Sequence, residues 1–288
     1  MPDSEQLVDP GDESPIELDR YPINELSSPG GEKLLAKCKN ELAMTGCIVL
    51  PAFIRRTSLA QLNADVHDHV RNAHTGRRLM NVYGTGDDAP NLPPDHPRRM
   101  LMEHTNRLVP GDLIDRATLI FCLYRNHLFQ EFIAACVGAS KVHEYADPLG
   151  GLVINVIPGE CQQPWHFDIN EFAVSILTQA ALEGGYFEYL PNARKPGQEG
   201  ATIIRSILQG NRSGVRTLKL QPGDLQVFLG RNSLHRVSPV RGNRERHSII
   251  LSYTARPGRI GSVDRALRLF GRVSQRHVST EGTLDPFS

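Results

Sequence analysis

Residues 151–179, with the sequence GLVINVIPGECQQPWHFDINEFAVSILTQ, give the clearest indication of the fold. It holds two runs rich in β-branched residues, 151–157 and 172–179, with turn-forming Pro and Gly between them. Short runs bounded by turn residues are typical of β-strands. Runs of the same texture follow at 186–190, 217–220, 225–229 and 248–254. This regular spacing predicts a sandwich or barrel, of which the jelly roll is one form.

The residues before this stretch have a helical pattern. Apolar residues at helical spacing predict helices over 29–45 and 58–73, and a further helical region over 112–137 that is broken near residue 125. Ser28 suits the N-cap of the first helix, because its hydroxyl can accept a hydrogen bond from the first turn. The apolar run CIVL after this helix predicts a buried strand.

Loops and chain ends complete the predicted organisation. Residues 84–99 are rich in Gly, Pro and Asp, and a loop of this length in a compact domain indicates a binding role such as a lid. We expect this loop and the C-terminal tail, in which 265–272 forms one helix, to cover a pocket. The predicted divisions are a disordered tail at 1–19 and one domain at 20–288, made of a helical front at 28–138, a core at about 142–256 and a tail at 257–288.

Composition narrows the possible functions. The 288 residues carry 32 Lys+Arg and 32 Asp+Glu, so the net charge of zero argues against a nucleic-acid or membrane-surface protein, which needs a cationic face. No stretch has the ~18 apolar residues of a membrane span. The five cysteines form no CxxC pair. We therefore expect a cytoplasmic protein without disulfides. The balanced charge is compatible with either a monomer or a homodimer.

Three residues carry a pattern for metal chemistry. In a strand, residues i and i+2 share a face, so His166 and Asp168 in the sequence Trp165-His166-Phe167-Asp168 present an imidazole and a carboxylate to one side. His235, after the strand predicted at 225–229, is the natural third ligand. Two His and one carboxylate around open positions are the arrangement of non-haem Fe(II) oxygenases. The open positions can hold a co-substrate and O2.

A second pattern suits a carboxylate-bearing co-substrate. Arg246 and Ser248 share a face at the start of a predicted strand, and a guanidinium can bind a carboxylate through two hydrogen bonds. The far carboxylate of 2-oxoglutarate needs such a partner. Arg244 has the same parity and is the rival candidate. Asn155, on the strand before the His-Asp pair, either faces the co-substrate or satisfies local backbone groups.

Each polar residue beside the proposed metal ligands has two possible roles. Gln163, Asn170 and Glu171 either touch a polar substrate or satisfy local strand and loop structure. Trp165 has the opposite parity to His166, which favours packing in the core over a place in the pocket wall. Arg231 binds a substrate carboxylate or forms a structural ion pair with an acid such as Glu188 or Asp224.

These residues together resemble a known superfamily. The chain is similar to Fe(II)/2-oxoglutarate-dependent oxygenases in the triad His166, Asp168 and His235 and in the Arg246-x-Ser248 element. The segments EGGYFEYLPN and PGDLQVFLGRNSLHRVSPV add to the resemblance. It is greatest for the branch of free-amino-acid radical halogenases and their hydroxylase relatives. The implied fold is α+β and mainly β, a double-stranded β-helix (jelly-roll, cupin-like) core buttressed by N-terminal helices.

The triad departs from the halogenases in one position. Halogenases of this branch have a small residue in place of the carboxylate, which leaves room for chloride, whereas this chain has Asp168. The resemblance therefore implies hydroxylation, or another oxidation such as desaturation. The implied cofactors are Fe(II), 2-oxoglutarate and O2. The implied reaction hydroxylates an unactivated C–H bond of a small polar metabolite, a free amino acid or derivative, in natural-product biosynthesis and releases succinate and CO2.

Two alternatives stay open from sequence alone. A cupin-like metalloenzyme that does not use 2-oxoglutarate would keep the His and Asp ligands but would not need Arg246. A non-catalytic jelly-roll binding module would need neither the metal ligands nor Arg246. The four intact residues His166, Asp168, His235 and Arg246 argue against the second alternative.

Overall fold

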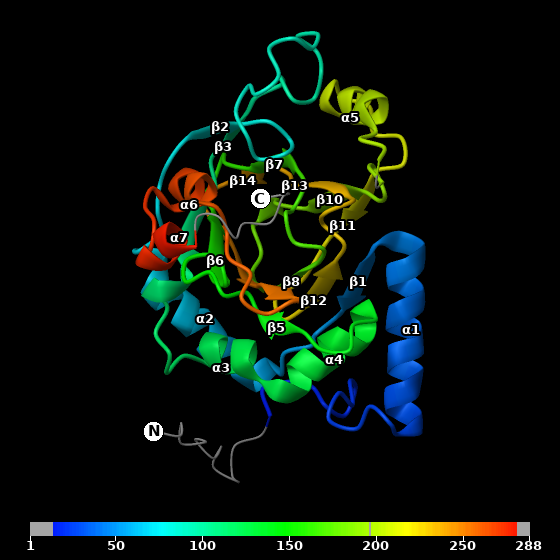
Figure 1. The fold of residues 1–288 in the computed structure, drawn as a ribbon. Coiled ribbons are helices and arrows are strands. Elements are labelled where there is room, and N and C mark those ends of the chain that lie inside the picture. The colour runs from blue at the N-terminus through cyan, green and yellow to red at the C-terminus, as the bar shows by residue number, and fades with distance from the viewer. Residues whose placement is uncertain (1–13, 196, 281–288) are drawn as a thin grey trace.

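The computed structural model describes residues 14–195 and 197–280, and two antiparallel sheets form its centre (Figure 1). The larger sheet contains, in spatial order, β1 (Cys47–Leu50), β12 (Leu225–Phe228), β8 (Ala173–Gln179), β15 (Arg246–Leu251), β6 (Leu152–Ile157) and β4 (Arg107–Pro110). The smaller sheet contains β11 (Arg216–Leu218), β10 (Phe187–Leu190), β13 (Leu234–Val237) and β7 (Gln163–His166). The fold is the predicted double-stranded β-helix, mainly β, with helices outside it.

Three short two-stranded ribbons accompany the two sheets in the described residues. They pair β2 (Arg78–Met80) with β3 (Met102–His104), β14 (Val240–Arg241) with β9 (Glu183–Gly184), and β16 (Tyr253–Thr254) with β5 (His143–Glu144). Within the larger sheet, Ser248 lies opposite Asn155 and Ile249 lies opposite Ile154. Because side chains alternate along a strand, Asn155 and Ser248 share one face and the two isoleucines share the other.

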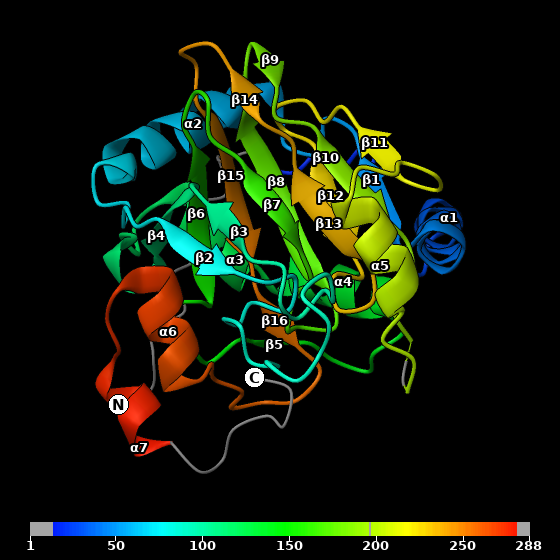
Figure 2. The same cartoon turned by 90° about the horizontal axis from the view of Figure 1, so that it is seen from above.

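Four helices cover the apolar face of the larger sheet (Figure 2). They are α1 (Pro29–Thr45), α2 (Arg56–Val70), α3 (Leu119–Arg125) and α4 (His127–Val137). The other helices are η1 (Gly111–Leu113), α5 (Ala201–Leu208), α6 (Val263–Phe270) and α7 (Gln275–Ser279). Side chains of α1 to α4 and this sheet face form one buried cluster that includes Phe53, Ile154, Ile176 and Ile249. In the described ranges, no helix combines the length and apolarity needed to cross a membrane.

Local signals in the sequence set the helix ends. Ser28 Oγ accepts a hydrogen bond from the Gly31 N–H at 3.1 Å, and Gly46 ends α1 with a φ of 72° that favours glycine. The break predicted near residue 125 is confirmed, because Asn126 ends α3 and its side chain caps α4. The helix predicted over 58–73 runs from Arg56 to Val70.

The structure departs from the sequence predictions in several segments. The front half is not wholly helical, since it holds β2, β3 and β4. Helix α5 and strand β13 were not predicted, and the helical region expected from residue 112 begins at Leu119. Of the predicted tail at 1–19, residues 1–13 lie outside the described residues. Packing starts before residue 20, because Ile16 is buried and bridges Ile54.

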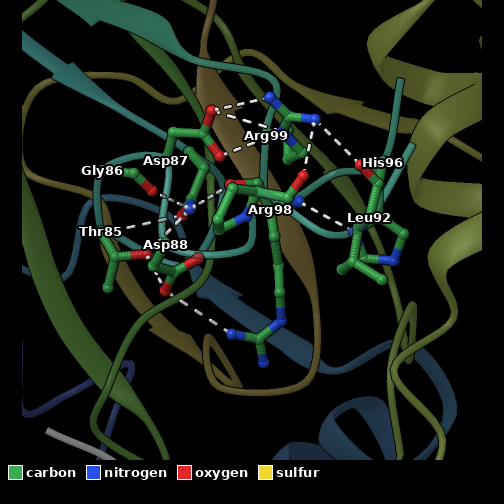
Figure 3. A network of polar contacts seen from close by, with 10 residues as sticks. Thr85, Gly86, Asp87, Asp88, Leu92, His96, Arg98 and Arg99 are labelled. Carbon is green, nitrogen blue, oxygen red and sulfur yellow. Dashed lines mark hydrogen bonds and ion pairs between the residues drawn. The ribbon is translucent and has the colours of Figure 1, made fainter. Parts of the chain in front are cut away.

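The loop at 84–99 is ordered by its own polar contacts (Figure 3). The Arg99 guanidinium donates to the Asp87 carboxylate and to the carbonyl oxygen of Leu92. Arg98 pairs with Asp88 inside the loop and with Glu199 just before α5. These contacts hold the loop as a fixed wall beside α5.

Phe53 tests how strongly the helices stabilise the sheet. Its ring is fully buried and lies 5.7 Å from Phe129 and 6.4 Å from Phe132, between centroids. We expect Phe53→Ala to lower the free energy of unfolding by about 3–5 kcal/mol in urea denaturation. Met44→Ala, at an exposed position of α1, changes it by less than ~0.5 kcal/mol. Equal effects of the two changes would contradict this account of the core.

Candidate active site

The two histidines of the predicted triad face each other across the smaller sheet. His166 on β7 and His235 on β13 are direct cross-strand partners, and their ring centroids are 4.1 Å apart. His166 Nδ1–H donates to the Pro164 carbonyl oxygen at 2.8 Å, and His235 Nδ1–H donates to that of Ser233 at 3.0 Å. These bonds fix the tautomer, so both Nε2 lone pairs are available to a metal.

Asp168 completes the cluster from outside the strand. Strand β7 ends at His166, so the strand alternation assumed from sequence does not place this carboxylate. A hydrogen bond from the Asp168 N–H to the Gly230 carbonyl oxygen, 3.1 Å long, holds the segment instead. Asp168 Oδ1 lies 3.6 Å from His235 Nε2 and 4.0 Å from His166 Nε2. Ligand atoms from the three residues all lie within 4.8 Å of one another.

Gly230 leaves the room that this carboxylate occupies. A Cβ built on Gly230 would lie 1.8 Å from Asp168 Oδ2 and 2.6 Å from its Cγ. Such contacts are impossible without a shift of the carboxylate, so the position requires glycine. The sequence analysis did not single out this residue, although Gly230-Arg231 directly precedes the segment that carries His235.

The charges in the cluster suit metal binding. Burial, followed by the nearby His235, holds the pKa of His166 well below its usual range, so this imidazole is a neutral ligand at neutral pH. Burial opposes ionisation of Asp168, but the nearby His235 outweighs it and lowers the pKa of the carboxyl to about 2. The site therefore presents neutral imidazole and ionised carboxylate, the protonation states that a divalent metal needs.

A chain of amide side chains leads from the triad into the protein. Gln163 Nε2 lies 3.1 Å from His166 Nε2, and Gln163 Oε1 accepts from Asn155 at 2.9 Å. Asn155 in turn accepts from Asn106 at 2.9 Å, and Asn106 accepts from Arg78 at 2.8 Å. Asn155 thus orients Gln163 rather than backbone groups. Since one lone pair cannot serve two partners, a metal on His166 Nε2 would replace the Gln163 contact.

Arg246 and Ser248 occupy the interior as a pair. Arg246 is buried, its Nη1 donates to Ser248 Oγ at 3.2 Å, and its Nε donates to the Gly185 carbonyl oxygen at 3.0 Å. The described residues offer it no carboxylate partner. Burial lowers the pKa of this guanidinium to about 10, so it stays charged at neutral pH and would gain from an anion. Arg244, the rival, is exposed in the preceding turn.

A cavity of about 160 Å³ opens beside His166 and Asp168. The apolar part of its wall comes from the larger sheet, the β2–β3 ribbon and α6, and it includes Met80, Leu108, Val153, Phe172, Ile250 and Phe270. Helix α6 borders the cavity, as expected of the C-terminal tail, whereas from the loop at 84–99 only Gly84 is among the described lining residues. Arg246 and Ser248 do not line it.

The structure also places the remaining residues that the sequence singled out. Trp165 is buried against Ile204 and Ile207 of α5, so it packs away from the triad. Arg231 donates to the Ile169 carbonyl oxygen and lies 3.9 Å from Glu171, while Glu188 pairs with Arg236. Asn170 borders the cavity. Arg78, His104 and Arg265 also line the cavity, and no sequence motif marks these residues.

The side-chain atoms of the triad fit the Fe(II) ion that the fold implies. Two imidazole nitrogens and one carboxylate oxygen converge, and the glycine at 230 leaves space for the carboxylate. This set is suited to Fe(II) with open positions. The buried Arg246–Ser248 pair is suited to a carboxylate. Fold and site therefore define the class of Fe(II)/2-oxoglutarate-dependent oxygenases, with O2 as the further substrate.

Comparison with known proteins agrees with this class and identifies the family of the chain. The Halogenase D family model matches residues 31–259, so the chain belongs to that family. No curated protein matches the sequence significantly. The identity of the family leaves the outcome of the reaction open, because the triad of this chain includes Asp168.

Solved structures confirm the fold at low sequence identity. AviO1 from Streptomyces viridochromogenes Tue57 superposes with a TM-score of 0.51 at 15% identity, over 78% of this chain and 96% of that one. The non-haem α-ketoglutarate-dependent epimerase SnoN from nogalamycin biosynthesis gives 0.50 at 11% identity, over 77% and 83% of the two chains. The carbocyclase SnoK from the same biosynthesis gives 0.50 at 11%, over 75% and 82%.

Gly230 provides a test of the site geometry. We expect Gly230→Ala to weaken Fe(II) binding about 10- to 100-fold, because the new methyl group displaces the Asp168 carboxylate. Anaerobic titration calorimetry measures the dissociation constant. Gly30→Ala is the matched control, since its Cβ would meet only side-chain atoms at 3.4 Å and beyond. Unchanged Fe(II) affinity in Gly230→Ala would show that Asp168 is not a ligand.

Proposed function

We propose that this protein is an Fe(II)- and 2-oxoglutarate-dependent hydroxylase of a small polar metabolite. The observation that carries the proposal is the Asp168 carboxylate, which lies with both imidazoles in one cluster of ligand atoms. A carboxylate there takes the coordination position that chloride needs in the halogenases that the chain resembles. The third ligand therefore favours transfer of oxygen over transfer of chlorine.

Each part of the site has a defined task in this proposal. His166, Asp168 and His235 hold Fe(II), and Arg246 with Ser248 holds the far carboxylate of 2-oxoglutarate. Asn155 supports this region through Gln163, beside the open face of His166. Iron, 2-oxoglutarate and O2 supply the oxidising chemistry, with succinate and CO2 as co-products. The chain orients the substrate and excludes water through its apolar wall.

The resemblance to free-amino-acid halogenases and their relatives supports an amino acid or derivative as substrate. The cavity of about 160 Å³ suits a molecule of that size. Hydroxylation rather than desaturation is the proposed outcome. A reducing, cytoplasmic setting fits the absence of disulfides among the described cysteines, all of which are free thiols.

The Arg246 variant tests the co-substrate site. Anaerobic addition of Fe(II) and 2-oxoglutarate should give the wild type a weak visible charge-transfer band. We expect Arg246→Met to weaken 2-oxoglutarate binding about 10- to 100-fold, the cost of losing a charged hydrogen-bonding partner. Arg244→Met, in the exposed turn, should leave the titration unchanged. Iron binding without a band in the wild type would instead favour the cupin-like alternative.

Product analysis tests the type of reaction. A panel of amino acids and metabolites is screened for stimulated succinate release in chloride buffer, and products are identified by mass spectrometry. We expect the wild-type product to gain one oxygen atom and no chlorine, because Asp168 fills the position that chloride would need. Asp168→Gly should lose hydroxylation. A chlorinated product from the wild type, or loss of two hydrogens without gain of oxygen, would contradict the proposal.

A further inference from the structure

Helix α6 brings one uncommitted cation to the cavity. Ser262 caps this helix by accepting from the Arg265 backbone N–H, and Ala266 and Phe270 bury its inner face. The half-buried Arg265 side chain lies along the cavity wall and extends toward Gly84 of the front loop, where a built Cβ would lie 3.8 Å from Arg265 Nη1. Its guanidinium makes no hydrogen bond or ion pair within residues 14–195 and 197–280.

The neighbouring charged groups already have partners. Arg268, on the same helix, donates to Asp264 at 2.7 Å. Arg78 donates through both terminal nitrogens, to Asn106 and to the Leu269 carbonyl oxygen. Among the described cations at this end of the cavity, Arg265 is the one whose terminal nitrogens are both free to bind a ligand, whereas Arg78 has only Nε without a partner.

The acids that border the cavity are also committed. Asp147 Oδ1 accepts from the N–H groups of Leu149 and Gly150, and its Oδ2 accepts from Gly261 N–H and His277 Nε2. The other carboxylate in the described wall, Asp168, belongs to the triad. The wall thus offers no free carboxylate to a positively charged substrate side chain.

The charges around the cavity also favour a ligand that carries a carboxylate. With the proposed cofactors bound, divalent iron, the 2-oxoglutarate dianion, Asp168 and Arg246 together are neutral. Arg265, which also lines the cavity, has no counter-charge of its own in the described wall. A carboxylate bound at Arg265 would supply this counter-charge.

We propose that Arg265 anchors the carboxylate of the substrate, and that the site selects amino acids whose side chain carries no positive charge. This inference rests on the proposed function and names the substrate class of the same site. The apolar wall formed by residues such as Leu108, Val153 and Ile250 holds an uncharged chain, while the carboxylate lies at α6. Amino acids with neutral side chains fit this arrangement, and lysine-like amino acids do not.

The test measures binding rather than turnover. The Fe(II)·2-oxoglutarate protein is titrated anaerobically, and the change in its charge-transfer band gives the dissociation constant. The probes are L-norleucine, L-leucine and L-methionine, their carboxamides, and L-lysine. For the wild type, at least one of the acids should bind about 10- to 100-fold more tightly than its carboxamide and than lysine, as expected for a charged hydrogen-bonding pair.

Variants of α6 assign this preference to one residue. Arg265→Met should weaken binding of the acid about 10- to 100-fold and abolish the preference over the carboxamide. Arg265→Lys should restore part of the affinity, because it keeps the charge and loses the fork. Arg268→Met is the matched control and should change the affinity by less than about twofold, since that guanidinium already pairs with Asp264. Circular dichroism checks that each variant is folded.

The outcomes separate this inference from the proposed function. Absence of the charge-transfer band in the wild type would count against the proposed function itself. A band together with an unchanged acid-to-carboxamide ratio in Arg265→Met would overturn the anchoring role of Arg265. Loss of the preference in Arg78→Met alone would assign the anchor to Arg78 and overturn it as well. Tighter binding of lysine than of every acid, or no binding of any acid, would refute the substrate class.

Discussion

The antiparallel pairing of β7 with β13 sets the distance between the two imidazoles, and the rest of the site depends on it. His166 and His235 are opposite each other in the register, where side chains on one face come within about 5 Å. A shift by one residue would turn one imidazole to the other face of the sheet. Trp165 opposes such a shift, because its ring is buried on the other face against α5.

Backbone groups around the histidines orient the imidazole rings of the site. Both Nδ1–H groups donate to a carbonyl oxygen two residues earlier in the chain, so no further side chain is needed to fix the rings. Asp168 has no strand to hold it and relies on the bond to the Gly230 carbonyl. The metal cluster is thus preorganised by local backbone geometry, which lowers the conformational cost of metal binding.

Sequence patterns predicted the parts of the site that are local in the chain. His166 and Asp168 are two residues apart, and Arg246 and Ser248 likewise, so spacing alone suggested that they act together. Alternation was the wrong reason for the first pair, since β7 ends at His166. It was adequate for the second, whose residues share the inner face of β15. The turn position of Arg244, which distinguishes it from Arg246, needed the strand boundary that only the structure provides.

Contacts between distant segments could not be predicted in this way. Arg78, Asn106 and Asn155 come from three segments of the chain, and no spacing rule links them. Their hydrogen bonds form only after β2, β4 and β6 have been brought together. The amphipathic α5 and the short strands of the front half were likewise missed, because tertiary packing, and not propensity, stabilises such short elements.

The position of α6 connects substrate choice to the end of the chain. The helix forms part of the cavity wall, and the segment after it is tied down by the buried His277, which bonds Asp147 beside the same cavity. The part of the wall that α6 supplies lies outside the jelly roll, so its charge can change without altering the strands that hold the triad. The metal centre and the substrate anchor are therefore built on separate elements, and specificity can vary while the chemistry is conserved.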